Sequence, residues 1–355
     1  MDSSVTVGFE VKSPSAQPIQ PMTTLASRIS APARLVARIV RLVREHFRDF
    51  LINATHTGFI SLSSAPSIRR RFYSIVILAH SIEKGLSLPT PKKAFGKEKM
   101  RALLTLVQSY DRSFSAFPLE MAYGAINAYL DFHRDDKPSD PFISELANFV
   151  ATTPIFEGIR PTGGVKIYSG IEQKPNGDIP QFALFLRSRS SCRNFKQEPV
   201  SAQEIVKIIE TAQAAPSQCN RQSSRAHLYQ AREQIIRLLK LQSGASGFAD
   251  QVPNLFVVTS DVTAWSGPGQ RNQCYVDGAL FAQSLLLACH AYNIAACPLN
   301  LAIDNRKEAR IKDAAAIPPH ERLIMMIAFG RPAEDRLRYA MSPRLPVGET
   351  LVLHP

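Results

Sequence analysis

Polar residues without an apolar period occupy the start of the chain, and helical patterns follow them. Residues 1–30 are rich in Ser, Pro, Thr and Gln, a composition that predicts a disordered tail. Beyond them, apolar positions recur every three or four residues and predict helices over Phe72–Lys84, Lys97–Tyr110 and Leu119–Phe132, with polar turns between. We therefore expect residues 31–150 to form an all-helical N-terminal extension.

This extension begins with an arginine-rich amphipathic segment. Its arginines recur every three or four residues, at Arg34, Arg38, Arg41, Arg44 and Arg48. Apolar residues fill the positions between them, as in a helix with one basic face. Two interpretations stay open: a helix that packs on the protein with its arginines in water, or a helix that lies on an anionic membrane surface.

The second half of the chain alternates helical and extended patterns. Residues 151–180 are rich in Pro and Gly and predict a linker. A capping box, Ser201 with Glu204, marks the start of a helix over Ala202–Ala214. Further helices are predicted at Arg232–Leu241 and Gly278–Tyr292, and strands at Ala226–Gln230, Asn254–Thr259, Ala296–Leu301 and Leu323–Phe329. This alternation indicates an α/β or α+β domain over residues 181–355.

One apolar stretch has the length of a membrane span. No charged residue occurs between Asp277 and Asp304. Polar residues interrupt the stretch, however, at Gln283, Ser284, His290, Asn293 and Asn300. We therefore expect a core helix over Leu280–Tyr292 followed by a buried strand, and no membrane span.

Composition narrows the choice of partner and compartment. The formal net charge of +12 favours an anionic partner. Aromatic residues are not interleaved with basic ones as in a nucleic-acid platform, so we expect no nucleic-acid binding. The five cysteines show no CxxC spacing, and the N-terminus shows no signal peptide, which together favour a cytoplasmic location without disulfides or zinc.

Three short segments carry residues suited to a phosphorylated planar ligand. The first runs from Arg189 to Phe195, and alternate residues of an extended segment point the same way. Arg189, Ser191 and Arg193 can therefore converge on a phosphate, which matches the planar fork of a guanidinium. A surface loop with solvated arginines is the alternative.

The other two segments add amides and a further cation. In Ala215–Gln222, the side chains of Asn220 and Gln222 can read the edge of a heteroaromatic ring, although an ordinary polar turn has the same composition. The third segment follows a predicted buried strand and comprises Gly330–Pro332 and Ser342–Pro346.

In this order the segments resemble the nitroreductase family of FMN-dependent oxidoreductases. The family's Arg-x-Ser-x-Arg-x-Phe opening is met at Arg189–Phe195, and its Pro-Ser-x-x-Asn-x-Gln stretch at Pro216–Gln222. An Asp-Gly-Ala helix follows at Asp277–Ala279, then a small-residue turn at Ala295–Asn300 and a late basic residue, Arg344. The resemblance implies an α+β fold with a mainly antiparallel sheet flanked by helices, FMN as cofactor, and a homodimer that shares its FMN sites between subunits.

The resemblance also implies roles for particular residues. The FMN phosphate and ribityl chain would be held by Arg189, Ser191, Arg193 and Arg344, with Ser190 where many members carry a second basic residue. The flavin ring or ribityl chain would meet Pro216, Ser217, Asn220 and Gln222, and flavin N5 the backbone at Pro298, Leu299 and Asn300. FMN would carry hydride from NAD(P)H to a small organic acceptor, so neither a catalytic side chain nor a metal is expected.

The loop Asp261–Gln273 contains Trp265, the only tryptophan. This side chain either stacks on a substrate or packs in the interior. Many members of the family insert helices in this loop to roof the substrate pocket. Because the loop is short here, we expect the N-terminal extension to close the pocket instead.

The segment His80–Leu86, with Phe95-Gly96 downstream, resembles an extension of nitroreductase-like proteins associated with bacterial polysaccharide synthesis. His80 and Glu83 lie three apart on a predicted helix and can bind a metal or each other. A hydrogen-bonded pair is favoured, because no further ligands stand nearby. The alternative to an enzyme is a flavin-binding scaffold or sensor without turnover, held at a membrane surface by the Arg34–Arg48 helix.

Overall fold

The computed structural model describes residues 31–57, 67–88, 91–134, 140–165, 179–333, 339 and 347–354. Contacts divide the chain into two compact units within its first helix, between Phe47 and Arg48. The tail expected at residues 1–30 and residues 166–178 of the expected linker lie outside the described residues.

Helix α1 (Ala31–His56) covers the arginine-rich segment. Large apolar side chains are exposed along its first five turns: Leu35, Val36, Ile39, Val40, Leu42, Val43 and Phe47. The end of the helix belongs to the second unit. There Ala54 is buried, and Asp49 pairs with Arg322 at 3.0 Å.

Four helices form the remainder of the N-terminal extension: α2 (Ile68–Leu86), α3 (Lys97–Gln108), α4 (Phe117–Phe132) and α5 (Pro141–Thr152). A short 3-10 turn, Pro154–Phe156, follows them. Their apolar faces meet in one core, in which Ile75, Leu103 and Ile126 are fully buried. The expected all-helical extension is confirmed, because three- and four-residue spacing lets each helix bury one stripe.

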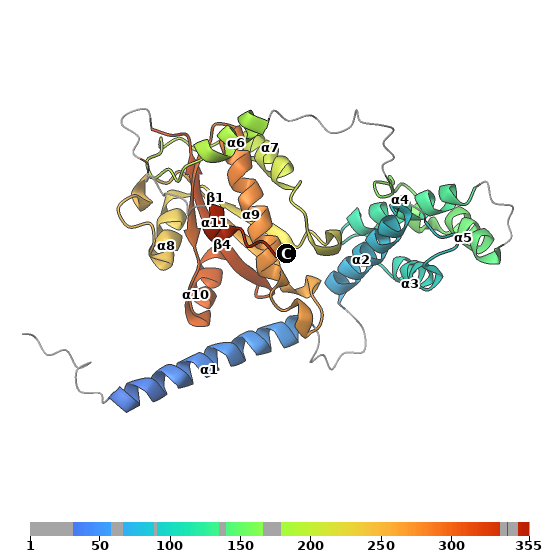
Figure 1. Ribbon diagram of the computed structural model, residues 1–355, viewed down its shortest axis with the longest axis horizontal. Coiled ribbons are helices and arrows are strands. Elements are labelled where there is room, and N and C mark those ends of the chain that lie inside the picture. The colour runs from blue at the N-terminus through green and yellow to red at the C-terminus, as the bar shows by residue number, and fades with distance from the viewer. Residues whose placement is uncertain are drawn as a thin grey trace, which may run out of the picture. The chain divides into compact units, whose positions relative to one another are not determined.

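The part of the chain from residue 179 onward, called here the second domain, is built on a four-stranded antiparallel sheet in the order β1-β2-β4-β3. The strands are β1 (Ser224–Tyr229), β2 (Asn254–Asp261), β3 (Ala295–Asn300) and β4 (Glu321–Gly330). All four expected strands are present, and with the flanking helices they confirm the expected α+β fold (Figure 1).

The same part of the chain contains α6 (Ile179–Ser188) and the short α11 (Val347–Thr350). Both faces of the sheet are covered by α7 (Ala202–Ala212), α8 (Arg232–Gln242), α9 (Gln273–Ala291) and α10 (Asn305–Ala315). Alternation along β2 shows how. Leu255 and Val257 join one core with α8 and α10, whereas Phe256 and Val258 join the other with α7 and α9. Every residue of β2 is buried for that reason.

Helix α9 is, among the described residues, the one helix long and apolar enough by length and composition to cross a membrane. The core helix of a globular domain passes the same test. Here α9 packs on β2, β4 and α7 and buries Ala282, Leu285 and Cys289 (Figure 1). Packing on the sheet accounts for its apolar character, as expected for this stretch.

Gly278 of the Asp-Gly-Ala motif brings α9 close to the sheet. A Cβ added there would lie 2.6 Å from Cγ1 of Ile324 in β4. We expect Gly278→Ala to lower the free energy of unfolding by about 1–3 kcal/mol, since a packed interface cannot absorb a methyl group without shifting.

Urea unfolding of Gly278→Ala, Ile324→Ala and the double variant measures this effect. The double variant should lose less stability than the two single losses together, because removing the isoleucine side chain makes room for the methyl group. Gly269→Ala is the matched control, since a Cβ there meets no atom within 4 Å. Additive losses would mean that the close approach is not what Gly278 provides.

Candidate functional site

The first predicted segment lies along the edge of β3. Ser191 forms a parallel bridge with Ala296, whose carbonyl accepts a hydrogen bond from Cys192 N at 3.0 Å. Further on, Phe195 pairs with Pro332 beyond the end of β4. Cys192 and Phe195 are buried, which anchors the segment, while Arg193 is exposed.

The guanidinium groups of this segment are available to a ligand. Arg189 Nη1 is buried and has no hydrogen-bond partner. Arg193 Nη1 makes one long contact, to the carbonyl of Ser191 at 3.5 Å. Burial raises the pKa of the nearby Cys297 thiol, and the positive charges of both arginines oppose that rise. The guanidinium groups of Arg189 and Arg193 therefore lie close enough to β3 to influence the Cys297 thiol.

Strand β3 also carries the three residues expected near flavin N5. Pro298, Leu299 and Asn300 pair with Ile327, Met326 and Met325 of β4. Leu299 is buried and Asn300 is exposed. Pro298 has no N–H group, so any backbone donor at this point comes from its neighbours. Ala295–Asn300, expected as a small-residue turn, is therefore the strand β3 itself, because all six residues pair with β4. The first segment and Pro298–Asn300 lie at the same edge of the sheet.

The second predicted segment is a tight turn between α7 and β1. Ser217 Oγ accepts a hydrogen bond from Gln222 N at 3.1 Å, and Gln222 Nε2 donates to Asn220 Oδ1 at 3.2 Å. Cys219, Asn220 and Gln222 have positive φ. The backbone of Gln218 donates to Asp277 Oδ2 at 2.9 Å, which ties the turn to the Asp-Gly-Ala motif of α9.

The two segments lie at opposite corners of the sheet. The second leads into Ser224, which pairs with Ser260, and Ser260 pairs with Arg322 at the start of β4. The first lies beside Ala296, which pairs with Phe329 at the end of β4. Strands β1 and β3 are also the two outer strands, about 14 Å apart at 4.8 Å per strand. One chain therefore does not bring these segments together. The third segment's Ser342 and Arg344 lie outside the described residues.

A pocket of about 430 Å³ adjoins the second segment. Ser217, Gln222 and Arg225 line one side of it, and Phe72 of α2 and Phe117 of α4 line another. The N-terminal extension thus contributes residues to the lining of this pocket. The sequence gives no indication that Phe72 and Phe117 line a pocket with Ser217, because they precede it by about 100 residues or more.

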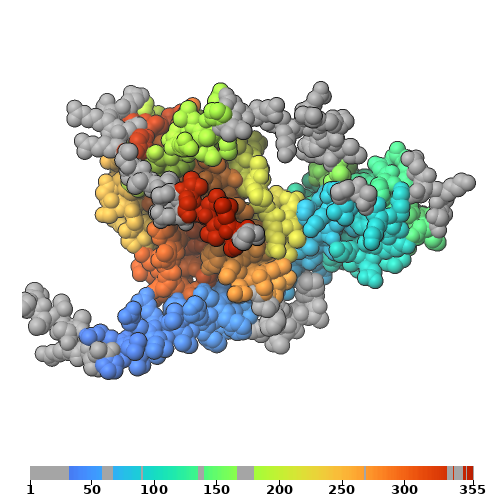
Figure 2. All heavy atoms as spheres, in the orientation of Figure 1, coloured from blue at the N-terminus to red at the C-terminus, as the bar shows by residue number. Residues whose placement is uncertain are grey.

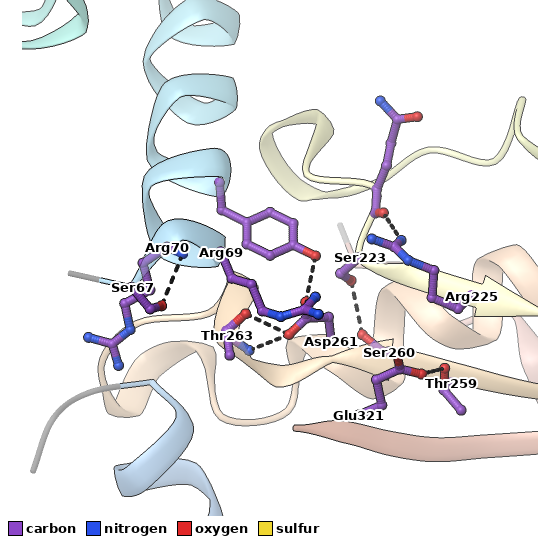
Figure 3. A network of polar contacts seen from close by, with 12 residues as sticks. Ser67, Arg69, Arg70, Ser223, Arg225, Thr259, Ser260, Asp261, Thr263 and Glu321 are labelled. Atoms are coloured by element: carbon purple, nitrogen blue, oxygen red, sulfur yellow. Dashed lines mark hydrogen bonds and ion pairs between the residues drawn. The ribbon is translucent and has the colours of Figure 1, made fainter. Parts of the chain in front are cut away.

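A polar network joins α2 to the sheet beside this pocket (Figure 3). Asp261, at the end of β2, accepts hydrogen bonds from Tyr73 OH at 3.1 Å and from Thr263 N at 2.9 Å. Arg69 Nη1 lies 3.5 Å from the same carboxylate. Burial and the Asp261 carboxylate raise the pKa of Tyr73, which remains a neutral donor. Arg225 in turn donates to the carbonyl of Gln222 at 2.8 Å.

Trp265 lies inside the protein. Its side chain is 2% exposed and packs with Tyr73, Ala264 and Cys274. The guanidinium of Arg221, itself buried, stands 4.9 Å from the centre of the indole ring. A ring so enclosed has no face for a substrate, so the structure favours the packing alternative.

His80 and Glu83 form the hydrogen-bonded pair that the spacing favours, with 3.3 Å between His80 Nδ1 and Glu83 Oε2. The other carboxylate oxygen accepts from Gly164 N at 2.8 Å. The described parts of the chain contain no cluster of three or more groups that could hold a metal ion. Glu83 therefore fixes the loop after α5 against α2.

Comparison with known proteins locates the similarity in the second domain. Residues 186–255 and 240–331 match the model described as the nitroreductase family. A solved FMN-dependent nitroreductase from Clostridium difficile is 20% identical, with 44% of this chain and 90% of that chain covered and a TM-score of 0.38.

Two further solved structures are similar over slightly less than half of this chain. A protein assigned as a nitroreductase in Desulfovibrio desulfuricans, solved in complex with FMN, is 25% identical, covers 49% of this chain and 96% of its own, and has a TM-score of 0.42. A nitroreductase family protein from Clostridium novyi is 20% identical over 43% of this chain and 86% of its own, with a TM-score of 0.38. Residues 186–331, which contain the antiparallel sheet and its main flanking helices, match the nitroreductase family.

Proposed function

We propose that this protein is an FMN-dependent oxidoreductase that takes hydride from NAD(P)H and passes it to a small organic acceptor. The observation that carries the proposal is the pair of guanidinium groups at the β3 edge, inside the region that matches the nitroreductase family. Bound FMN would supply the redox chemistry by accepting and releasing two electrons with a proton.

The donor set at this edge fits a flavin phosphate. A buried guanidinium nitrogen without a partner, as at Arg189, leaves a desolvated donor that an anion can satisfy. Arg193 adds a second fork of donors, and Ser190 and Ser191 add hydroxyls. Arg344 completes the proposed set.

The opposite-corner arrangement supports a site made by two copies of the chain. In this proposal one copy supplies the phosphate residues and the backbone near Pro298, and the second supplies the Pro216–Gln222 turn. Exposed apolar surface is available for such a homodimer on α6, at Phe182, Leu184 and Leu186, and at the C-terminus, at Val347, Leu351, Val352 and Leu353. Figure 2 shows the C-terminal segment at the surface of the second unit. Two-fold assembly is the commonest symmetry of homo-oligomers.

The chain's own residues would then shape the acceptor site. Phe72 and Phe117 would form an apolar wall that excludes water, and Arg225 and Ser217 would orient polar groups of the acceptor. The resemblance of His80–Leu86 extends the proposal to a cytoplasmic role in polysaccharide biosynthesis.

The protein as purified, or after addition of FMN, should show the absorption bands of a flavin. Anaerobic NADPH or NADH should bleach the band near 450 nm. A colourless protein that cannot be reconstituted with FMN would refute the proposal.

Two controls separate the alternatives. Bound FMN that neither nicotinamide reduces would indicate a flavin-binding scaffold or sensor without turnover. Light scattering that finds a stable FMN-loaded monomer would reject the shared site and leave the β3-edge residues alone to explain binding.

A further inference from the structure

The first 18 residues of α1 form a surface with two chemically different faces. At 100° per residue, Arg34, Arg38, Arg41, Arg44 and Arg48 fall within an arc of about 120°. Leu35, Val36, Ile39, Val40, Leu42 and Val43 fall on the opposite side, within an arc of about 160°. The sorting is complete: no arginine stands among the large apolar residues.

The apolar face is in water along its length. Val36 is 59% exposed and Val43 is 62% exposed, and Ile39, Val40 and Leu42 between them are exposed to a similar degree. A soluble protein rarely leaves a continuous stripe of this kind uncovered unless something binds there. We therefore expect the apolar face of α1 to be covered by a binding partner, either a membrane or another macromolecule.

The charge of α1 distinguishes between the possible binding partners. Five arginines against one acidic residue, Glu45, make residues 31–48 strongly cationic. A nucleic acid would use the arginines but leave the apolar face in water. A second copy of the helix would cover the apolar face but bring like charges together. An anionic bilayer satisfies both faces, with the apolar side chains among the acyl chains and the arginines among the headgroups.

We propose that α1 binds the surface of an anionic lipid membrane and lies in its interface. The helix does not span the bilayer, since its arginines recur throughout its length. This proposal is independent of the flavin site, because it rests on α1 alone.

The full-length protein should co-sediment with vesicles of phosphatidylcholine containing 30% phosphatidylserine at 0.1 M salt. It should bind pure phosphatidylcholine vesicles much more weakly. Each arginine near an anionic surface contributes on the order of fivefold to partitioning. Arg38→Gln with Arg44→Gln should therefore weaken binding to the anionic vesicles by roughly 25-fold, whereas Arg38→Lys with Arg44→Lys should retain most of it.

The apolar face is tested by Val36→Gln with Val43→Gln, which should weaken binding on the order of tenfold. Glutamine favours a helix at least as well as valine, so the substitution does not disfavour α1 itself. Ala37→Gln is the matched control, because Ala37 lies on the arginine side. An unchanged thermal midpoint confirms that each variant is folded.

Three results would overturn the proposal. The protein could fail to bind anionic vesicles, or bind neutral and anionic vesicles equally. Alternatively, Val36→Gln with Val43→Gln could lower the molecular mass in light scattering without affecting vesicle binding, which would identify a second copy of the chain as the occupant.

Discussion

Arg193→Ala should weaken FMN binding by roughly 10- to 150-fold. The FMN phosphate carries nearly two negative charges, and a charge-assisted hydrogen bond contributes about 1.5–3 kcal/mol. Arg193 is exposed at the β3 edge, with one long contact of 3.5 Å to its own segment. Its removal should therefore lower ligand affinity and leave the fold intact. Arg193→Lys should recover only part of the loss, because an ammonium cannot reproduce the guanidinium fork.

Fluorescence titration with FMN and riboflavin distinguishes a phosphate ligand from a general effect. Riboflavin lacks the phosphate, so its affinity should change much less. Arg187→Ala is the matched control: it removes another exposed arginine, two positions before the segment, at the end of α6. Equal losses for both flavins would show that Arg193 does not bind the phosphate.

Asp261→Asn should lower the free energy of unfolding by about 2–4 kcal/mol. The Asp261 side chain is 2% exposed, and its two oxygens accept from Tyr73 OH, Thr263 N and Thr263 Oγ1. An amide offers one acceptor oxygen, so its NH₂ group must face donors that have lost their partner. A buried donor left without an acceptor costs about 1–3 kcal/mol, and loss of the partly exposed Arg69 ion pair adds up to about 1 kcal/mol.

Urea unfolding followed by circular dichroism measures this loss. Arg69→Ala should cost less than about 1 kcal/mol, because its guanidinium is partly exposed and 3.5 Å from the carboxylate. Tyr73→Phe should cost about 1 kcal/mol, the value of one hydrogen bond. A stability of Asp261→Asn within 0.5 kcal/mol of the natural protein would mean that the network does not hold α2 to the sheet.

The network also connects stability to the pocket. Tyr73 is adjacent to Phe72, and the two rings lie edge to face with centroids 5.0 Å apart. Weakening the contact between Tyr73 and Asp261 would loosen the wall that Phe72 contributes. We therefore expect Asp261→Asn to change acceptor selectivity as well as stability.

The sequence by itself determined the local elements. The capping box at Ser201 and Glu204 is present, with both reciprocal hydrogen bonds, because its spacing depends on only four consecutive residues. The continuous apolar run of β2 indicates a strand covered on both faces, and both faces are covered. The order of the short motifs was sufficient to indicate the nitroreductase-like fold.

Four of the described helices were not predicted individually: α5, α6, α10 and the short α11. Helix α6 begins at the edge of the predicted linker, and α10 has a strongly polar sequence with few apolar positions to reveal its period. The N-cap of α10 is nevertheless local: Asp304 accepts a hydrogen bond from Lys307 N. A capping signal alone, without an apolar stripe, does not identify a helix.

Only the tertiary structure decided which segments share a site. The strand order places Arg193 and Gln222 at opposite corners of the sheet, although both belong to motifs implied to bind one ligand. The tertiary packing also places Phe72 in the same pocket lining as Ser217 and buries the side chain of Trp265. These outcomes depend on packing between residues far apart in the chain. Side-chain periodicity carries no information about such pairings, because it records which face of an element is buried and not what buries it.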